Sequence, residues 1–265
     1  MLEKKDDFEH RLMEMFKTLS NLEEVEAIAI GGSRAVGKAD AKSDYDIYVY
    51  LSGEISPKKR KEVLKEYCDD MEINNHYWEL EDNCVLKNGV DIDLVYRNLD
   101  SFLEQVADVV ENHHPRNGYT TCMWFNLLTC KVIYDANHRL SDAKVRFAIQ
   151  YPEELKANII SHNMNLLTGR LPSYDKQIHK AVKRKDMVSI NHRVTEFLSS
   201  YFDILFAVNE LPHPGEKRLV TYCKERCRIL PSHFEDNLNR LFVGMFMGME
   251  MIVIEDIILE LKKVI

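Results

Sequence analysis

The sequence predicts an α/β fold: a small mixed, twisted sheet with helices in residues 1–115, followed by an all-helical bundle in residues 116–265. Short runs of β-favouring side chains are confined to the first half of the chain. Beyond Asp135, apolar residues recur only at helical spacing. The chain has 265 residues, 45% of them hydrophobic and 29% charged, which is the balance of a globular protein long enough for two domains.

The first half is expected to begin with a helix over residues 3–20. Its apolar side chains share one face: Phe8, Leu12, Met15, Phe16 and Leu19. Val25–Ile30 and Asp46–Leu51 are short runs rich in Ile, Val and Tyr, so both are predicted to be strands. Pro57–Met71 starts with proline and continues with Lys, Glu and Leu at helical spacing, which predicts a helix between strands.

A hairpin is predicted next, with strands over Tyr77–Leu86 and Val90–Tyr96. The dipeptide Asn88–Gly89 separates them, and it tolerates the positive φ angles that tight hairpin turns require. A helix over residues 101–111 and a loop over His113–Gly118 follow. The domain boundary is expected near this loop, between about residues 112 and 140.

The second half is predicted to be helical throughout. The expected helices cover residues 140–150, 153–169, 174–185, 187–209, 215–229 and 233–263. Two prolines in Leu211–Gly215 make the clearest break, because proline does not fit a helix interior.

Charge excludes several classes of partner. The net charge of −8 gives no global positive field, which argues against long nucleic acid as a partner. Residues 1–7 carry charges of both signs and lack the apolar core of a secretory signal, so a cytoplasmic location is expected. Four acidic residues interrupt the apolar segment Leu241–Ile265, so no membrane span is expected there.

The segment Ile30–Ala35 has the composition of a phosphate-binding turn. Gly31 and Gly32 let the backbone turn sharply and approach a ligand without a Cβ in the way. Ser33 adds a hydroxyl, and N–H groups at the start of a following helix favour an anion. Gly32 and Ser33 are therefore predicted to bind phosphate, and Arg34 either contacts the nucleotide or is solvated.

Asp44 and Asp46 stand two residues apart at a predicted strand, so both carboxylates project from one face. Two adjacent acids repel each other without a counterion, and hard oxygen ligands close together suit Mg²⁺. A third acid is expected from the second hairpin strand, where Asp91 and Asp93 also share a face. We favour Asp93 as the third metal ligand, with Asp91 as the alternative. The third acid could also help to deprotonate an attacking hydroxyl.

These elements together resemble the DNA polymerase β-like nucleotidyltransferase superfamily. The resemblance covers residues 24–96 and is carried by Gly32–Ser33, a ten-residue spacer, Asp44–Ile47 and Ile92–Leu94. Tyr45 replaces the aliphatic residue that is more common between the two acids. The resemblance implies the nucleotidyltransferase fold and a two-metal transfer of a nucleoside monophosphate, with Mg²⁺ as the metal, ATP as the expected substrate and release of pyrophosphate.

The second half resembles that of small-molecule nucleotidyltransferases, including the DUF4037 type and the kanamycin and lincosamide enzymes. The residues concerned are Gly118–Asp135, Asn209 and Pro214–Leu219. The resemblance implies a small-molecule acceptor and an active site in a cleft between the halves. Lys217 could contact triphosphate oxygens, and Glu196 could act as a general base. The alternatives are nucleotidylation of a protein side chain and a regulatory module that binds nucleotide without turnover.

Overall fold

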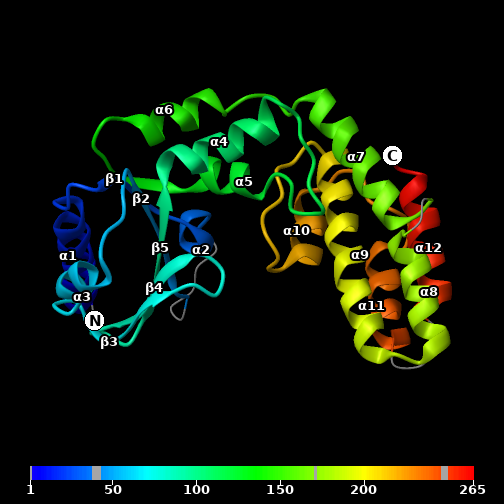
Figure 1. The fold of residues 1–265 in the computed structure, drawn as a ribbon, viewed down its shortest axis with the longest axis horizontal. Coiled ribbons are helices and arrows are strands. Elements are labelled where there is room, and N and C mark those ends of the chain that lie inside the picture. The colour runs from blue at the N-terminus through cyan, green and yellow to red at the C-terminus, as the bar shows by residue number, and fades with distance from the viewer. Residues whose placement is uncertain (1, 38–42, 170–171, 246–249) are drawn as a thin grey trace. The chain divides into compact units, whose positions relative to one another are not determined.

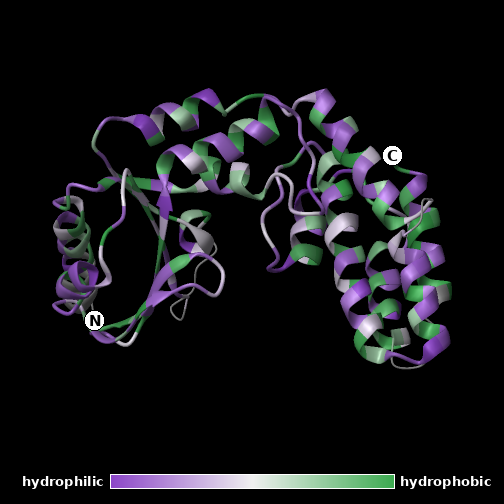
Figure 2. Cartoon of the chain, viewed as in Figure 1, coloured by the Kyte–Doolittle hydropathy of each residue, from purple (hydrophilic) through white to green (hydrophobic). Residues whose placement is uncertain are grey.

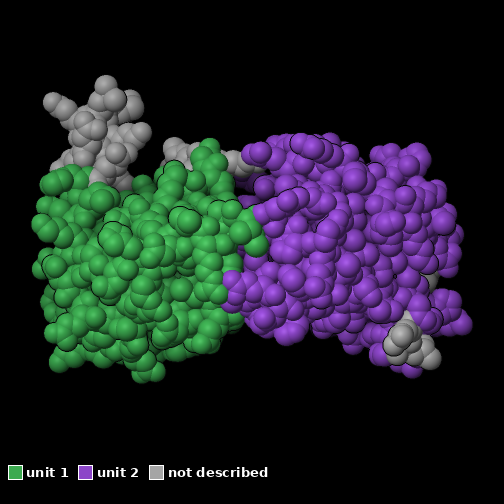
Figure 3. All heavy atoms as spheres, turned by 90° about the horizontal axis from the view of Figure 1, so that it is seen from above, with its two compact units in different colours: residues 1–105, 126–149 green, residues 106–125, 150–265 purple. Residues whose placement is uncertain are grey.

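The protein divides into two compact units that are not continuous in sequence. The computed structural model describes residues 2–37, 43–169, 172–245 and 250–265, with side chains from His10 onward except those of Glu250 and Met251. Unit 1 comprises residues 1–105 and 126–149, and unit 2 comprises residues 106–125 and 150–265 (Figure 3). The sequence-based boundary at residue 115 assigned residues 126–149 to the second half, whereas these residues pack with the first.

Unit 1 is built on a six-stranded mixed sheet (Figure 1). The elements of this part of the chain are α1 (Leu2–Ser20), β1 (Val25–Ile30), α2 (Gly32–Ala35), β2 (Tyr45–Leu51), α3 (Pro57–Leu64), β3 (Cys68–Asn75), β4 (Leu80–Leu86), β5 (Asp91–Asn98), α4 (Leu99–Val110), α5 (Cys122–Thr129), β6 (Lys131–Asp135) and α6 (Arg139–Arg146). The strand order is β3-β4-β5-β2-β1-β6, and β2 and β5 are parallel neighbours. The other neighbouring pairs are antiparallel.

The two faces of the sheet have different coverings. On one face, α1 and α3 enclose a core to which the alternate residues Ile47, Val49 and Leu51 of β2 contribute. Side chains of opposite parity in β2 point to the other face, where Tyr50 packs against Phe102 of α4 with 5.0 Å between ring centroids. The period of two along β2 therefore separates the hydrophobic core from the face on which Asp46 lies.

The predicted hairpin is confirmed, and one predicted helix is corrected. The β4–β5 pair turns at Asn88–Gly89, where Gly89 has φ +80°. The helix predicted over Pro57–Met71 ends at Leu64, and residues from Cys68 onward form β3, which pairs with β4. The run of Lys and Glu favoured a helix locally, but strand pairing that buries Cys68 decides the structure.

A second correction concerns residues 131–135. They were expected in the all-helical half of the chain, whereas α5 stops at Thr129 and Lys131–Asp135 form β6, an edge strand antiparallel to β1. The run Val132–Tyr134 is β-branched and aromatic, which suits a strand.

Unit 2 is a bundle around a long central helix. Its helices are α7 (Glu153–Leu167), α8 (Tyr174–Arg184), α9 (Met187–Val208), α10 (Leu219–Arg226), α11 (Phe234–Met245) and α12 (Glu250–Lys262). Both α7 and α8 pack along α9, and α11 packs against α12. The single helix predicted over 233–263 is therefore two helices. Hydrophobic residues of these helices form the core of the bundle, and hydrophilic residues lie between them along the chain (Figure 2). The central helix α9 differs at its C-terminal end, where residues 200–208 are all buried.

A buried polar cluster fixes the segment before α5 to the bundle within unit 2. Asp203 of α9 is 1% exposed and accepts hydrogen bonds from the Thr120 amide (2.9 Å), the Thr120 hydroxyl (2.6 Å) and the Asn163 amide (3.0 Å). Burial raises the pKa of Asp203 to about 7, although these hydrogen bonds oppose the rise. Next to it, the Thr121 hydroxyl accepts a hydrogen bond from the amide of His213. His213 is fully buried, and burial lowers its pKa to about 3.

Within the described ranges, no helix combines the length and the apolar character that crossing a membrane would require.

Candidate active site

Three carboxylates come together where the parallel strands β2 and β5 begin. Asp44 immediately precedes β2, Asp46 lies in β2, and Asp93 of β5 is the direct partner of Asp46 in the parallel register. One carboxylate oxygen from each of the three lies within 4.8 Å of the others, and all three side chains are half-buried. A group of hard oxygen ligands at this spacing matches the chemistry of a divalent-cation site.

The same strand register separates the two candidates for the third acid. Asp93 is part of the carboxylate cluster, and Asp91 is not. Asp91 lies at the first position of β5, is exposed, and pairs with Val85 of β4. The structure thus places Asp93 with Asp44 and Asp46, as the sequence interpretation favoured.

Gly32 lies against the acid cluster so closely that no side chain fits. Its φ is +55°, and a Cβ built on it would stand 1.7 Å from Oδ2 of Asp46. The preceding Gly31 is restricted by packing alone, because a Cβ there would meet the Tyr48 ring at 2.4 Å. The Gly31 amide donates a 2.8 Å hydrogen bond to the Asp46 carbonyl, which holds this turn against β2. The diglycine therefore brings bare backbone next to the carboxylates.

Ser33 has an unsatisfied hydroxyl. Its Oγ is buried and has no hydrogen-bond partner among the described residues. Ser33 follows Gly32 in the single turn of α2, one residue from the contact with Asp46. An unpaired hydroxyl costs free energy when buried, so the position suits a group that completes its hydrogen bonding on binding.

Arg34 supports the acid-bearing segment in the structure. Its Nε donates to the Asp44 carbonyl at 2.9 Å, Nη2 donates to the Ser43 carbonyl, and the guanidinium lies 3.7 Å from the centre of the Tyr45 ring. Lys131 of β6 in turn donates to the Arg34 carbonyl at 3.0 Å. These contacts hold the chain just before β2. The Arg34 side chain would have to give up some of them to contact a nucleotide, as was predicted for it. Residues 38–42 of the spacer lie outside the described residues.

Two polar residues of β4 border the cluster, and neither is among the site residues predicted from the sequence. Asn83 pairs with Asp93 across the antiparallel β4–β5 register and donates a 2.8 Å hydrogen bond to Asp93 Oδ1. Glu81 lies two residues away on the same face of β4. Burial and the Asp93 carboxylate raise the pKa of Glu81, and Asn83 opposes this. The available signal was the alternation of polar and buried residues in β4, opposite Asp93 in the predicted hairpin.

The two predicted site residues of the helical half lie in unit 2. Lys217 is exposed in the turn before α10, whose N-cap Arg218 has φ +57°. Glu196 is exposed on α9, where the Tyr174 hydroxyl donates to it over a long 3.5 Å contact. Their roles in binding and proton transfer stay predictions.

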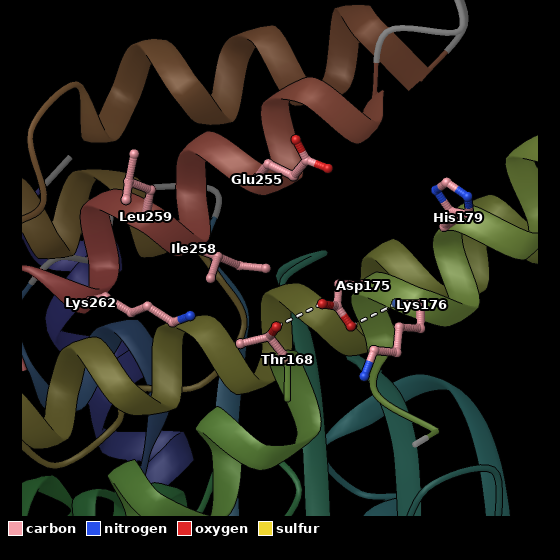
Figure 4. A pocket seen from close by; sticks show the side chains of 8 residues that line it. All are labelled: Thr168, Asp175, Lys176, His179, Glu255, Ile258, Leu259 and Lys262. Atoms are coloured by element: carbon pink, nitrogen blue, oxygen red, sulfur yellow. Dashed lines mark hydrogen bonds between the residues drawn. The ribbon is translucent and has the colours of Figure 1, made fainter. Parts of the chain in front are cut away.

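A separate cavity of about 370 Å³ lies in unit 2 between α8, the end of α7 and α12 (Figure 4). It contains none of the predicted site residues. Asp175 faces it, but that carboxylate already accepts hydrogen bonds from Thr168 (2.7 Å), the Ser173 hydroxyl (2.5 Å) and the Lys176 amide (2.7 Å). These bonds close the turn into α8, so we assign Asp175 a structural role.

Comparison with known families identifies both parts of the chain. Residues 14–112 match the family described as Polymerase beta, Nucleotidyltransferase. Residues 122–218 match the domain of unknown function DUF4037. One part of the chain thus matches a polymerase β-type nucleotidyltransferase domain, and the part that follows matches a DUF4037 domain. The resemblance expected from Gly32, Ser33 and the three acids is thereby confirmed, and the nucleotidyltransferase domain holds all of these residues.

Several solved structures are distant neighbours. A nucleotidyltransferase-like protein from Exiguobacterium sibiricum 255-15 is 9% identical, with coverage of 94% of this chain and 71% of that chain and a TM-score of 0.43. An aminoglycoside 6-adenyltransferase from Bacillus subtilis is 11% identical, with coverage of 95% and 89% and a TM-score of 0.28. No curated protein matches the chain in sequence. The function is therefore inferred from the family and the residues of the site.

Proposed function

We propose that the protein is a Mg²⁺-dependent nucleotidyltransferase that transfers AMP from ATP to a hydroxyl group of a small-molecule acceptor. The observation that carries the proposal is the meeting of Asp44, Asp46 and Asp93 within 4.8 Å of one another, inside a nucleotidyltransferase domain. Two further features support it: the bare backbone of Gly32 against Asp46, and the unpaired hydroxyl of Ser33.

The three carboxylates fit a divalent cation by the chemistry of their donors. Packed together without a cation, they would repel one another, and Mg²⁺ accepts such oxygens together with water and substrate phosphates. Asp44, Asp46 and Asp93 would hold the metal, which when bound supplies charge neutralisation for the triphosphate and polarises the reacting phosphorus centre.

The residues around the carboxylates bind and orient the substrate. Because Gly32 has no side chain, its backbone lies directly against the Asp46 carboxylate, and the neighbouring Ser33 hydroxyl is available to donate to a phosphate oxygen. The acceptor hydroxyl attacks the α-phosphorus and gives its proton to one of the carboxylates of the cluster. The bond from the α-phosphorus to the oxygen bridging to the β-phosphorus breaks, and pyrophosphate leaves with that oxygen.

The proposal is tested with α-labelled nucleoside triphosphates and the full chain. We expect pyrophosphate release and transfer of the label to a small molecule when Mg²⁺ and a suitable acceptor are present, and neither in the presence of EDTA or in Asp46→Asn. A screen over hydroxylated acceptor classes, with each of the four triphosphates, identifies both substrates.

Two outcomes would contradict this assignment. Label incorporated into the protein itself or into an added protein would indicate nucleotidylation of side chains. Metal-dependent nucleotide binding, with no pyrophosphate release for any acceptor class, would indicate a regulatory module instead.

A further inference from the structure

A chain of two asparagine side chains leads to the third acid of the site. Asn75 Nδ2 donates to Asn83 Oδ1 at 2.9 Å, and Asn83 Nδ2 donates to Asp93 Oδ1 at 2.8 Å. The three residues belong to the adjacent strands β3, β4 and β5. The hydrogen bonds therefore cross the sheet from its edge to the acid cluster.

The direction of this chain is set by its components. An amide side chain has a donor end and an acceptor end. Since the oxygen of Asn83 accepts from Asn75, its nitrogen is turned toward Asp93 and donates to the Asp93 carboxylate. Asn75 is itself held at its other end, because its Oδ1 accepts from the backbone amide of Tyr77 at 2.9 Å. Each link thus determines the orientation of the next.

We infer that Asn83 is a positioning residue that holds the Asp93 carboxylate in the orientation required to ligate a divalent cation, and that Asn75 acts through it. This rests on the proposed function of the Asp44–Asp46–Asp93 cluster. The hydrogen bond from Asn83 holds Oδ1 of Asp93 toward β4. In this orientation one carboxylate oxygen of Asp93 lies within 4.8 Å of a carboxylate oxygen of Asp44 and of Asp46. Groups that orient metal ligands in this way typically change metal affinity by 10- to 100-fold when they are removed.

Asn83 also opposes the effect of charge repulsion on the Asp93 side chain. Asp93 has the Asp46 carboxylate as its neighbour on one side and Glu81 near it on the other strand. An unrestrained Asp93 side chain would rotate away from these like charges. A neutral donor opposite Asp93 holds it in place without adding to the negative charge.

The experiment measures the binding of Mn²⁺ alone to the full chain, without nucleotide, by electron paramagnetic resonance. Asn83→Leu keeps the approximate size of the side chain and removes both ends of the amide. We expect it to weaken Mn²⁺ binding about tenfold or more. Val85→Ala is the matched control, because Val85 lies on the same face of β4 and pairs with Asp91, outside the cluster. It should leave Mn²⁺ affinity unchanged.

The hydrogen bond from Asn75 to Asn83 is tested by comparing single and double variants. Asn75→Ala should weaken Mn²⁺ binding by about two- to fivefold, less than loss of the direct contact. The double variant should bind Mn²⁺ as Asn83→Leu does, because Asn75 acts only through Asn83. Thermal melting of each variant, followed by circular dichroism, separates a local effect on affinity from loss of the fold.

The inference is overturned if Asn83→Leu binds Mn²⁺ like the wild type, or if Val85→Ala weakens binding equally. Asp93→Asn distinguishes this failure from that of the proposed function. If Asp93→Asn weakens binding and a folded Asn83→Leu does not, the metal site stands and only the positioning role fails. If Asp93→Asn has no effect, the metal assignment itself is wrong.

Discussion

Carboxylates occur among polar neighbours in both units, but their surroundings differ. In unit 2, Asp203 is almost fully buried, and three hydrogen bonds to Thr120 and Asn163 complete its surroundings. In unit 1, Asp44, Asp46 and Asp93 are half-buried and face one another, and the nearby Ser33 hydroxyl has no partner among the described residues.

This difference separates a structural polar site from one built to bind. The surroundings of Asp203 supply donors, so the site is complete without a ligand and ties the segment before α5 to the bundle. The acids of unit 1 lie within 4.8 Å of one another, and without a cation this like-charge proximity opposes the fold. Substitution should therefore reduce stability in unit 2 and activity in unit 1.

The largest effect is expected for Asp46→Asn. Loss of this carboxylate removes a metal ligand, so transfer activity should fall by about 10³-fold or more. The melting temperature should stay the same or rise slightly without metal, because a like-charge contact is relieved. Rates of pyrophosphate release and melting curves provide the measurements. A variant that keeps activity within a few fold would remove Asp46 from the site.

Gly32→Ala should be the next most damaging change, although it alters no charge. The new methyl group would clash with Oδ2 of Asp46, and the φ of +55° adds about 1–2 kcal/mol of strain. We expect activity to fall about 10²-fold and Mn²⁺ affinity to fall with it. Gly37→Ala is the control, since its φ is +71° and its Cβ would meet nothing within 4 Å. Equal losses in both variants would show that backbone strain, and not the contact with Asp46, is responsible.

Asp203→Ala tests whether the buried polar cluster of unit 2 stabilises the fold. It leaves the buried backbone amide of Thr120 without its acceptor, whereas Asn163 keeps its hydrogen bonds to the Arg116 and Ile159 carbonyls. The free energy of unfolding should therefore fall by about 2–4 kcal/mol. Urea denaturation of the full chain measures this change. Glu196→Ala, an exposed position of the same helix, should stay within about 0.5 kcal/mol of the wild type. A comparable loss in both variants would argue against a special role for the cluster.

The pH dependence of stability should show two opposing contributions in unit 2. The pKa of Asp203 is raised from 3.8 to about 7, so the folded state holds a proton that the unfolded state loses, and stability falls as pH rises between these values. The pKa of His213 is lowered from 6.5 to about 3, so only the unfolded state gains that proton, and stability falls as pH drops through this range. Between about pH 4 and 6.5 the two slopes oppose each other.

Variants of His213 and Asp203 should each reveal the contribution of the other residue to the pH dependence of stability. Relative to the wild type, His213→Asn should lose stability with rising pH by about 1.4 kcal/mol per unit between pH 4 and 6.5, and Asp203→Asn should gain by a similar amount. Urea denaturation at three pH values measures both. Unchanged slopes in both variants would mean that neither group keeps its buried protonation state.

The smallest effect is expected for Asp91→Asn. Asp91 is exposed and outside the cluster, so its charge acts on the site only through screened, long-range interactions. Activity should remain within about threefold of the wild type, whereas Asp93→Asn should behave like Asp46→Asn. The reverse order would mean that Asp91 is the ligand in the working enzyme.

The proximity of the three acids could be predicted from the sequence more readily than the strands around them. The spacing of two between Asp44 and Asp46, and the turn at Asn88–Gly89 that sets β5, depend on local rules. The strand β3 was missed because its residues follow a Lys- and Glu-rich helix, and only pairing with β4 decides their conformation. Asn83 could not be selected from its own segment, since its role depends on its cross-strand partner Asp93. Non-local pairing was the information that local patterns lacked.

The position of β6 also bears on how the chain is synthesised. This strand covers the edge of β1 but begins about 100 residues after β1 ends. A nascent chain that has emerged only as far as α5 carries all three acids, yet its sheet still presents an open edge with unpaired N–H and C=O groups. Pairing across so long a separation is slow, because a large loop must close first. Until residues 131–135 arrive, the half-made protein is open to strand pairing with other chains.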